Sequence, residues 1–196
     1  MGKEALLRAS SKDSSRGNIG AGTGCSVGKI AGMDRSMKSG LGQASLRLGD
    51  LVVSCLIAVN AVGDIRDPEK GNRPIAGLLG RDGKPGSTLD FLMDGESGED
   101  LLGKNTTIGC IATNAKLDKA GTLKVCQMGQ DGLARSIEPV HTLFDGDSLF
   151  CLASNRVESE PNLVGILAAK AVQRAIVNAG ESAEDAYGLC PTLLYD

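Results

Sequence analysis

The sequence predicts an α/β protein in which buried strands alternate with helices packed on them. Residues 51–60 form a nearly continuous apolar run that fits a strand buried on both faces, and residues 106–115 fit a second buried strand. Residues 161–180 have a Pro at the first turn and a Gly at the end, which is typical of a helix. The 196 residues suffice for one hydrophobic core, so we expect a single domain over residues 1–196.

The segments before residue 105 are rich in glycine and charge. A helix-like stretch, KEALLRA, opens residues 1–16 and gives way to a serine-rich stretch that we expect to be mobile. A glycine-dense segment, residues 17–42, precedes the first strand. Residues 64–104 combine charge and Gly with little periodicity, so we expect a linker without regular structure.

The segments after residue 115 contain clearer signals. Asp118 is predicted to cap a helix, because apolar residues from Leu123 to Leu133 recur with rough helical spacing. Residues 140–144 and 148–153 flank an Asp-Gly-Asp turn, and we expect them to pair as a hairpin.

Composition excludes several classes of function. A net charge of −3 and a pI near 5.3 argue against a nucleic-acid partner or an anionic membrane surface. The apolar run at residues 51–59 is far too short to span a membrane. The single histidine, His141, excludes two-histidine metal sites, and we expect neither a metal nor a cofactor. Six cysteines without a C-x-x-C pair, in a chain with no secretory signal, predict reduced thiols and a cytoplasmic location.

The glycine-dense segment resembles a nucleotide-binding loop only superficially. Gly20-Ala-Gly22-Thr-Gly24 precedes a buried strand instead of following one, and Ile30 stands where a P-loop after Gly28-Lys29 needs Ser or Thr. What remains is a loop ending in Lys29 that could supply N–H donors and a cation to a site. The alternative is a tight turn with a solvated lysine.

Asn105-Thr106 lies where a polar segment stops and a buried strand begins. An N-terminal-nucleophile hydrolase needs this arrangement, because cleavage before Thr106 would free an α-amine that can act as base for the Thr hydroxyl. A loop-to-strand junction can also begin with Thr for strand propensity alone. Asp145 and Asp147 are either a solvated turn or a carboxylate pair, and Asn60 is either a turn residue or a positioned amide donor.

Four stretches carry a family resemblance: GNIGAGTGCSVGK, AVNAVGD, NTTIGCIATNAKLDKA and MGQDGLARSIEPVHTLFDGD. Together with the last helix they resemble the L-aminopeptidase/D-esterase family of self-cleaving amidases, most of all its nylon-oligomer endohydrolase branch. The resemblance implies an α/β fold of the αββα sandwich type similar to Ntn hydrolases, here truncated at the N-terminus. It also implies a small peptide or oligoamide substrate. The missing N-terminal portion would expose sheet edges and apolar faces, so we expect a homo-oligomer.

The resemblance assigns roles to individual residues. It implies autocleavage at Asn105–Thr106 into an upstream fragment, residues 1–105 with the linker 64–104, and a downstream fragment, residues 106–196, with Thr106 as nucleophile. Lys29 would relay a proton or stabilise charge, and the Asn60 amide would donate to the oxyanion. Asp145 and Asp147 would position the new terminal amine. The alternative is a catalytically inactive member of the same fold that serves as an oligomerising or ligand-binding module.

Overall fold

The computed structural model describes residues 2–10, 15–96 and 105–190. In these residues the principal sheet has four strands: β3 (Leu41–Leu48), β4 (Leu51–Ala58), β7 (Ile108–Ala115) and β9 (Ser148–Val157), in the order β3-β4-β7-β9. Strand β4 is antiparallel to both β3 and β7, and β9 runs parallel to β7. The sequence predicts β4 and β7, and its predicted strand at residues 148–153 lies within β9.

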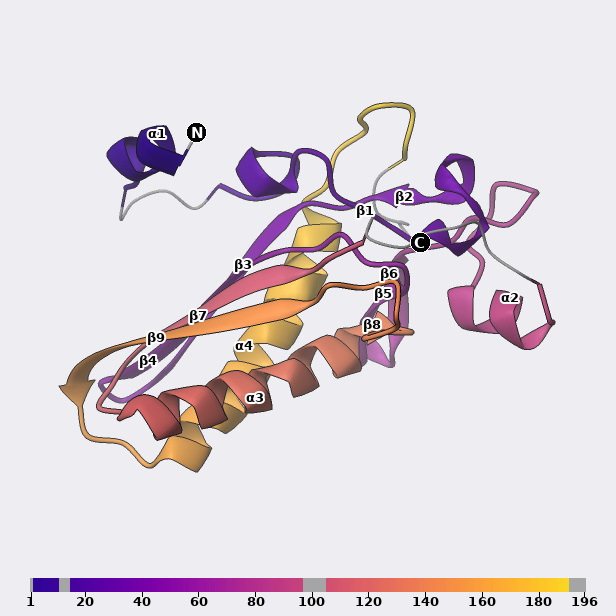
Figure 1. Cartoon of the computed structure of the whole chain (residues 1–196). Coiled ribbons are helices and arrows are strands. Elements are labelled where there is room, and N and C mark those ends of the chain that lie inside the picture. Colours follow the sequence, from indigo (N-terminus) through magenta and orange to yellow (C-terminus); the bar gives the residue numbers. More distant parts are fainter. Residues whose placement is uncertain (1, 11–14, 97–104, 191–196) are drawn as a thin grey trace.

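Two long helices, α3 (Lys119–Ser136) and α4 (Pro161–Glu181), cover one face of this sheet (Figure 1). Both helices were predicted, and the Asp118 cap is confirmed, because its carboxylate accepts from the Gly121 N–H at 2.7 Å. By length and composition alone α4 is apolar enough to cross a membrane, a possibility that the apolar run at residues 51–59 did not indicate. Most of that apolar stretch is buried here against β3 and β4, as in the core helix of a globular domain.

Glycine brings these layers close together. A Cβ on Gly42 would lie 2.0 Å from the carbonyl oxygen of Ala175 in α4, and one on Gly132 would lie 2.5 Å from that of Ala169. Both contacts would be with backbone atoms, which cannot turn aside as the end of a flexible side chain can. Part of the high glycine content therefore serves close packing between α4 and its neighbours.

The opposite face of the sheet is open over the described residues, which corrects the expectation for residues 51–60. Strand β4 buries one face, with Val53 and Ile57 fully covered, while Leu56 on the other face is 48% exposed. On the adjacent strands Ile108, Phe150 and Leu152 are more than half exposed. The continuous apolar run predicted a strand buried on both faces. The helices α3 and α4 bury only one face of the sheet.

The expectation of a linker without regular structure at residues 64–104 is wrong for residues 64–93, and residues 97–104 lie outside the described residues. This stretch contains β5 (Asp64–Asp67), β6 (Arg73–Ala76) and α2 (Thr88–Met93). Strand β5 pairs with β6 and with β8 (Ile137–Glu138) in a small sheet beside one end of the principal sheet (Figure 1).

Asp64 fixes the segment that follows β6. Its buried carboxylate accepts from the Leu78 N–H at 2.8 Å, from the Thr88 N–H at 2.7 Å and from the Thr88 hydroxyl at 2.6 Å. Burial raises the pKa of this carboxyl, and the hydrogen bonds oppose that rise. This buried aspartate thus holds the segment after β6 and the start of α2 in place, which the composition of the sequence does not predict.

The predicted pairing of residues 140–144 with 148–153 as a hairpin is also wrong, although residues 148–153 do form a strand. Residues 140–144 form a loop, and β9 takes β7 as its partner across the α3 connection. The helix-like N-terminus is present as α1 (Gly2–Arg8), which buries no residue, while most of the serine-rich stretch, residues 11–14, lies outside the described residues. The remaining elements are short: η1 (Gly20–Gly22), β1 (Ser26–Val27), η2 (Lys29–Ala31), η3 (Met33–Arg35), β2 (Met37–Lys38) and η4 (Pro68–Lys70).

Candidate active site

One end of the principal sheet gathers the predicted site residues. The register places Ala58, Ile108 and Ser148 side by side, so the end of β4 and the starts of β7 and β9 meet there. Asn60 follows β4, and Thr106 precedes β7. Three segments that are far apart in the sequence therefore converge at one sheet edge.

Lys29 reaches this edge from the glycine-dense segment. Its side chain is buried, and Nζ donates to Asn60 Oδ1 at 2.7 Å and to the Asn60 carbonyl at 3.3 Å. Burial lowers the pKa of this lysine to about 8, although Cys25 and Asp145 oppose the fall. A fraction of the amine is therefore neutral near neutral pH. The alternative of a solvated lysine is wrong.

Thr106 and Lys29 lie close together because both donate hydrogen bonds to the same acceptor. The Thr106 N–H donates to the Asn60 carbonyl oxygen at 2.9 Å, and Lys29 Nζ donates to the same atom. No more than two hydrogen-bond lengths therefore separate the two nitrogens. The Thr106 hydroxyl donates to the carbonyl oxygen of Asn105, the residue that precedes it. The structure thus brings Lys29, Asn60 and Thr106 together as predicted.

The two aspartates flank this group without contacting the Thr106 nitrogen. Asp145 Oδ1 accepts from the Val62 N–H at 3.3 Å, and Oδ2 accepts from the Thr142 hydroxyl at 2.7 Å. Asp147 Oδ1 accepts from the Thr107 N–H at 2.9 Å. In the continuous chain the carboxylates thus hold neighbours of Thr106, and the expected contact with its amine is one that only a cleaved chain could form.

His141 contacts the side chain of Asp147. Its Nδ1 lies 3.0 Å from Asp147 Oδ2, and the Asp147 side chain is 2% exposed. The histidine thus hydrogen-bonds the aspartate. Over the described ranges, no group of three or more His, Cys, Asp or Glu side chains is arranged to hold a metal ion.

Sequence reasoning missed two features of the site. The Gly146 N–H donates to the Asn105 carbonyl oxygen at 3.0 Å. Lys38 is fully buried, and its Nζ donates to the carbonyl oxygens of Cys25 at 2.6 Å and Ser39 at 2.8 Å. The lysine thereby holds the loop beside Lys29. Both features act through backbone groups, for which the sequence carries no motif.

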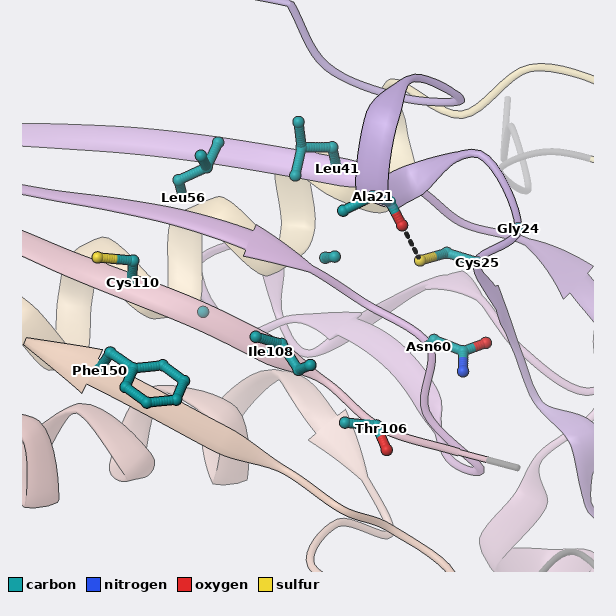
Figure 2. A pocket seen from close by; sticks show the side chains of 12 residues that line it. Ala21, Gly24, Cys25, Leu41, Leu56, Asn60, Thr106, Ile108, Cys110 and Phe150 are labelled. Atoms are coloured by element: carbon teal, nitrogen blue, oxygen red, sulfur yellow. Dashed lines mark hydrogen bonds between the residues drawn. The ribbon is translucent and has the colours of Figure 1, made fainter. Parts of the chain in front are cut away.

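An apolar groove of about 440 Å³ leads from Thr106 across the open face of the sheet. Figure 2 shows Thr106 and Asn60 at one end and Cys110 and Phe150 at the other. The wall opposite β7 comes from the glycine-dense loop, where the Cys25 thiol donates to the Ala21 carbonyl at 3.4 Å. The remaining lining residues are Gly24, Leu41, Leu56, Ala58, Ile108 and Gly109. A chain of methylene groups or an apolar side chain fits this lining.

Comparison with known proteins places these observations in a family. The model of peptidase family S58 matches residues 2–190. The chain belongs to peptidase family S58. An uncharacterized aminopeptidase of Mycobacterium leprae is 34% identical over 171 residues, which cover 86% of this chain and 45% of that protein. A 6-aminohexanoate-oligomer endohydrolase of Kocuria sp. is 30% identical over 164 residues, which cover 81% of this chain and 45% of that enzyme.

Solved structures support the fold assignment for this S58 chain. It superposes on the L-aminopeptidase D-Ala-esterase/amidase of Ochrobactrum anthropi with a TM-score of 0.64 at 20% identity, covering 97% of this chain and 52% of that one. A Burkholderia sp. beta-aminopeptidase gives a TM-score of 0.65 at 20% identity, covering 97% and 53%. The fold is therefore an Ntn-hydrolase-like α/β fold. The chain spans about half the length of the curated relatives it matches.

Proposed function

We propose that this protein is a self-processing amide hydrolase, with Thr106 as the nucleophile and Asn105–Thr106 as the bond it first cleaves. The observation that carries the proposal is the arrangement at that bond. The Thr106 hydroxyl already contacts the Asn105 carbonyl, whose oxygen also accepts a backbone N–H. The family contains aminopeptidases and amide hydrolases, and their substrates are amide bonds.

Self-cleavage follows from these contacts in two steps. The Thr106 oxygen attacks the Asn105 carbonyl carbon, the C–N bond breaks, and the nitrogen takes up the hydroxyl proton, which leaves an ester. Water then opens the ester into an Asn105 carboxylate and a free Thr106 hydroxyl and amine. Lys29, buried beside the Thr106 nitrogen with a pKa of about 8, is the group we assign to carry the proton.

Hydrolysis of a substrate repeats the attack with the freed amine as base. The Thr106 amine accepts the hydroxyl proton, the oxygen attacks the substrate carbonyl carbon, and the leaving amine departs with a proton. Water then releases the acyl group from Thr106. Asn60 is the side chain proposed to donate to the oxyanion, and its Oδ1 is already fixed by the Ser26 N–H and Lys29 Nζ. Asp145 and Asp147 would hold the new amine.

We propose a small peptide or an oligoamide as the substrate. The groove beside Thr106 is lined mainly by apolar side chains, and over the described residues no Lys, Arg, Asp or Glu is among them. Relatives are named as aminopeptidases and as oligoamide endohydrolases, so both classes should be assayed.

Denaturing mass analysis tests the self-cleavage proposal. The purified protein should yield fragments of residues 1–105 and 106–196, and Thr106→Ala should remain a single chain with the same fold. Thr122→Ala is the matched control, because it removes a threonine hydroxyl from the exposed start of α3. Cleavage at this bond in Thr106→Ala, or none in the unaltered protein, would refute the proposal.

A second candidate is an oligomerising or ligand-binding module without catalysis. It is favoured by the open apolar sheet face, on which Phe150 is 61% exposed and Leu152 65% exposed. Such a module would remain uncleaved under all conditions and would associate through this face, which the same mass analysis and a measurement of molecular mass in solution would detect.

A further inference from the structure

We propose that the backbone N–H of Gly146 stabilises the oxyanion both in self-cleavage and in substrate hydrolysis, an inference that rests on the proposed function. The Gly146 nitrogen lies 3.0 Å from the carbonyl oxygen of Asn105, the atom that becomes negatively charged when Thr106 attacks. Effective oxyanion donors lie about 2.7–3.1 Å from the position of the developing charge. The donor is therefore in place before the reaction begins.

The turn that carries this N–H is fixed on both sides. The Asp145 carboxylate accepts from the N–H of Val62 and from Thr142, while the Asp147 carboxylate accepts from the Thr107 N–H. A donor held in this way costs little reorganisation at the moment of reaction. This gives the two aspartates a role in the uncleaved chain: they position the amide between them.

Glycine is needed at position 146 for space. Its backbone does not lie in the left-handed region, so an L-residue would not be strained there. A Cβ, however, would lie 2.7 Å from Thr106 Oγ1, closer than real Cβ contacts allow. The missing side chain leaves room for the nucleophile between the turn and the Asn105 carbonyl.

The same N–H becomes available for the second reaction. Hydrolysis of the ester intermediate turns Asn105 into a carboxylate at the end of the upstream fragment, and departure of that end frees the Gly146 donor. We place the oxygen of a substrate carbonyl attacked by the same Thr106 oxygen where that of Asn105 lay. One backbone donor thus serves both tetrahedral intermediates, and each collapses with loss of an amine.

Replacing Gly146 by glycolic acid during reconstituted translation tests the donor without adding a side chain. The change turns the amide nitrogen into an ester oxygen, so the N–H is lost and the space is kept. We expect self-cleavage at Asn105–Thr106 to slow about 100-fold to 1,000-fold, the effect of removing one oxyanion donor. Hydrolysis of the introduced ester would give a fragment ending at Asp145, which mass analysis distinguishes from the product ending at Asn105. The same replacement at Gly83, whose N–H donates within an exposed loop, is the control.

Two side-chain variants complete the test. Gly146→Ala should also block cleavage, because its Cβ displaces the Thr106 hydroxyl, and combining it with Thr106→Ala should remove the steric conflict and restore normal thermal unfolding. Thr122→Ala, which removes a hydroxyl from the start of α3, should cleave at the unaltered rate. Cleavage of the glycolate protein at the normal rate, while Thr106→Ala stays intact, would overturn the role of Gly146 and leave the proposed function standing. An unaltered protein that never cleaves would overturn both.

Discussion

Lys29→Met should make the protein more stable while it removes the proposed proton carrier. The pKa of Lys29 falls from 10.5 to about 8 because its ammonium is buried. That fall corresponds to about 3 kcal/mol of lost folding free energy at neutral pH. A methionine side chain avoids this cost, and it forgoes hydrogen bonds with a net value of about 1 kcal/mol.

Neither acceptor is orphaned by the substitution. Asn60 Oδ1 keeps the Ser26 N–H, and the Asn60 carbonyl keeps the Thr106 N–H. We therefore expect a net gain of about 2 kcal/mol at neutral pH. Thr106→Ala is the parent for this comparison, because both proteins then stay uncleaved.

The gain in the free energy of unfolding from Lys29→Met should decrease as the pH rises. Well below about pH 8 the lysine is protonated in the folded and the unfolded chain, so the cost of burial is constant. Between about 8 and 10.5 only the unfolded chain keeps the proton, so the free energy of unfolding of the parent rises with pH. The advantage of methionine should therefore shrink over this interval.

Urea unfolding at about pH 7 and about pH 10 measures both effects. Lys124→Met, which removes an exposed ammonium from α3, is the control and should change stability little at either pH. A Lys29→Met protein that is less stable than its parent at neutral pH, or a difference that does not change with pH, would contradict the burial of a charged amine.

Two further substitutions test hydrogen bonds that hold the fold. Asp64→Ala should destabilise the fold by about 2–4 kcal/mol in urea unfolding, because the buried N–H groups of Leu78 and Thr88 lose their acceptor. Asp64→Asn should recover part of this loss. An Asp64→Ala protein that is destabilised no more than by an ordinary surface substitution would contradict the role of this carboxylate. Asp118→Ala should lower the free energy of unfolding by about 1 kcal/mol, since the Gly121 N–H loses its cap, and an unchanged melting temperature would contradict the cap.

The sequence predicts the elements whose signals are local. Asp118 and Pro161 mark helix starts, and the apolar runs before Asn60 and after Thr106 mark strands, so α3, α4, β4 and β7 are all present. The small sheet of β5, β6 and β8 was not predicted, because its strands are two to four residues long and depend on distant partners. The hairpin error has the same origin, since the choice of β7 as the partner of β9 is made across the whole of α3.

The candidate site divides in a similar way. Lys29, Asn60 and Thr106 are identified by side-chain type, by their places at loop and strand ends and by family resemblance, and the structure brings them together. Gly146 could not be identified, because a backbone N–H is the same chemical group at almost every residue. Only the fold shows that this one points at the Asn105 carbonyl and that the absent Cβ leaves room for a hydroxyl.

Self-cleavage should proceed at a rate independent of protein concentration. The groups that we assign to it are Lys29, Thr106 and Gly146. Hydrogen bonds through Asn60 and Asn105 connect them within a single chain. The open apolar face, by contrast, invites association with a second surface. Turnover of an added substrate can therefore depend on what covers the groove, whereas the first-order cleavage of Asn105–Thr106 should not. Mass analysis of freshly made protein across a wide dilution series measures the rate, and a fall on dilution would mean that another chain completes the site.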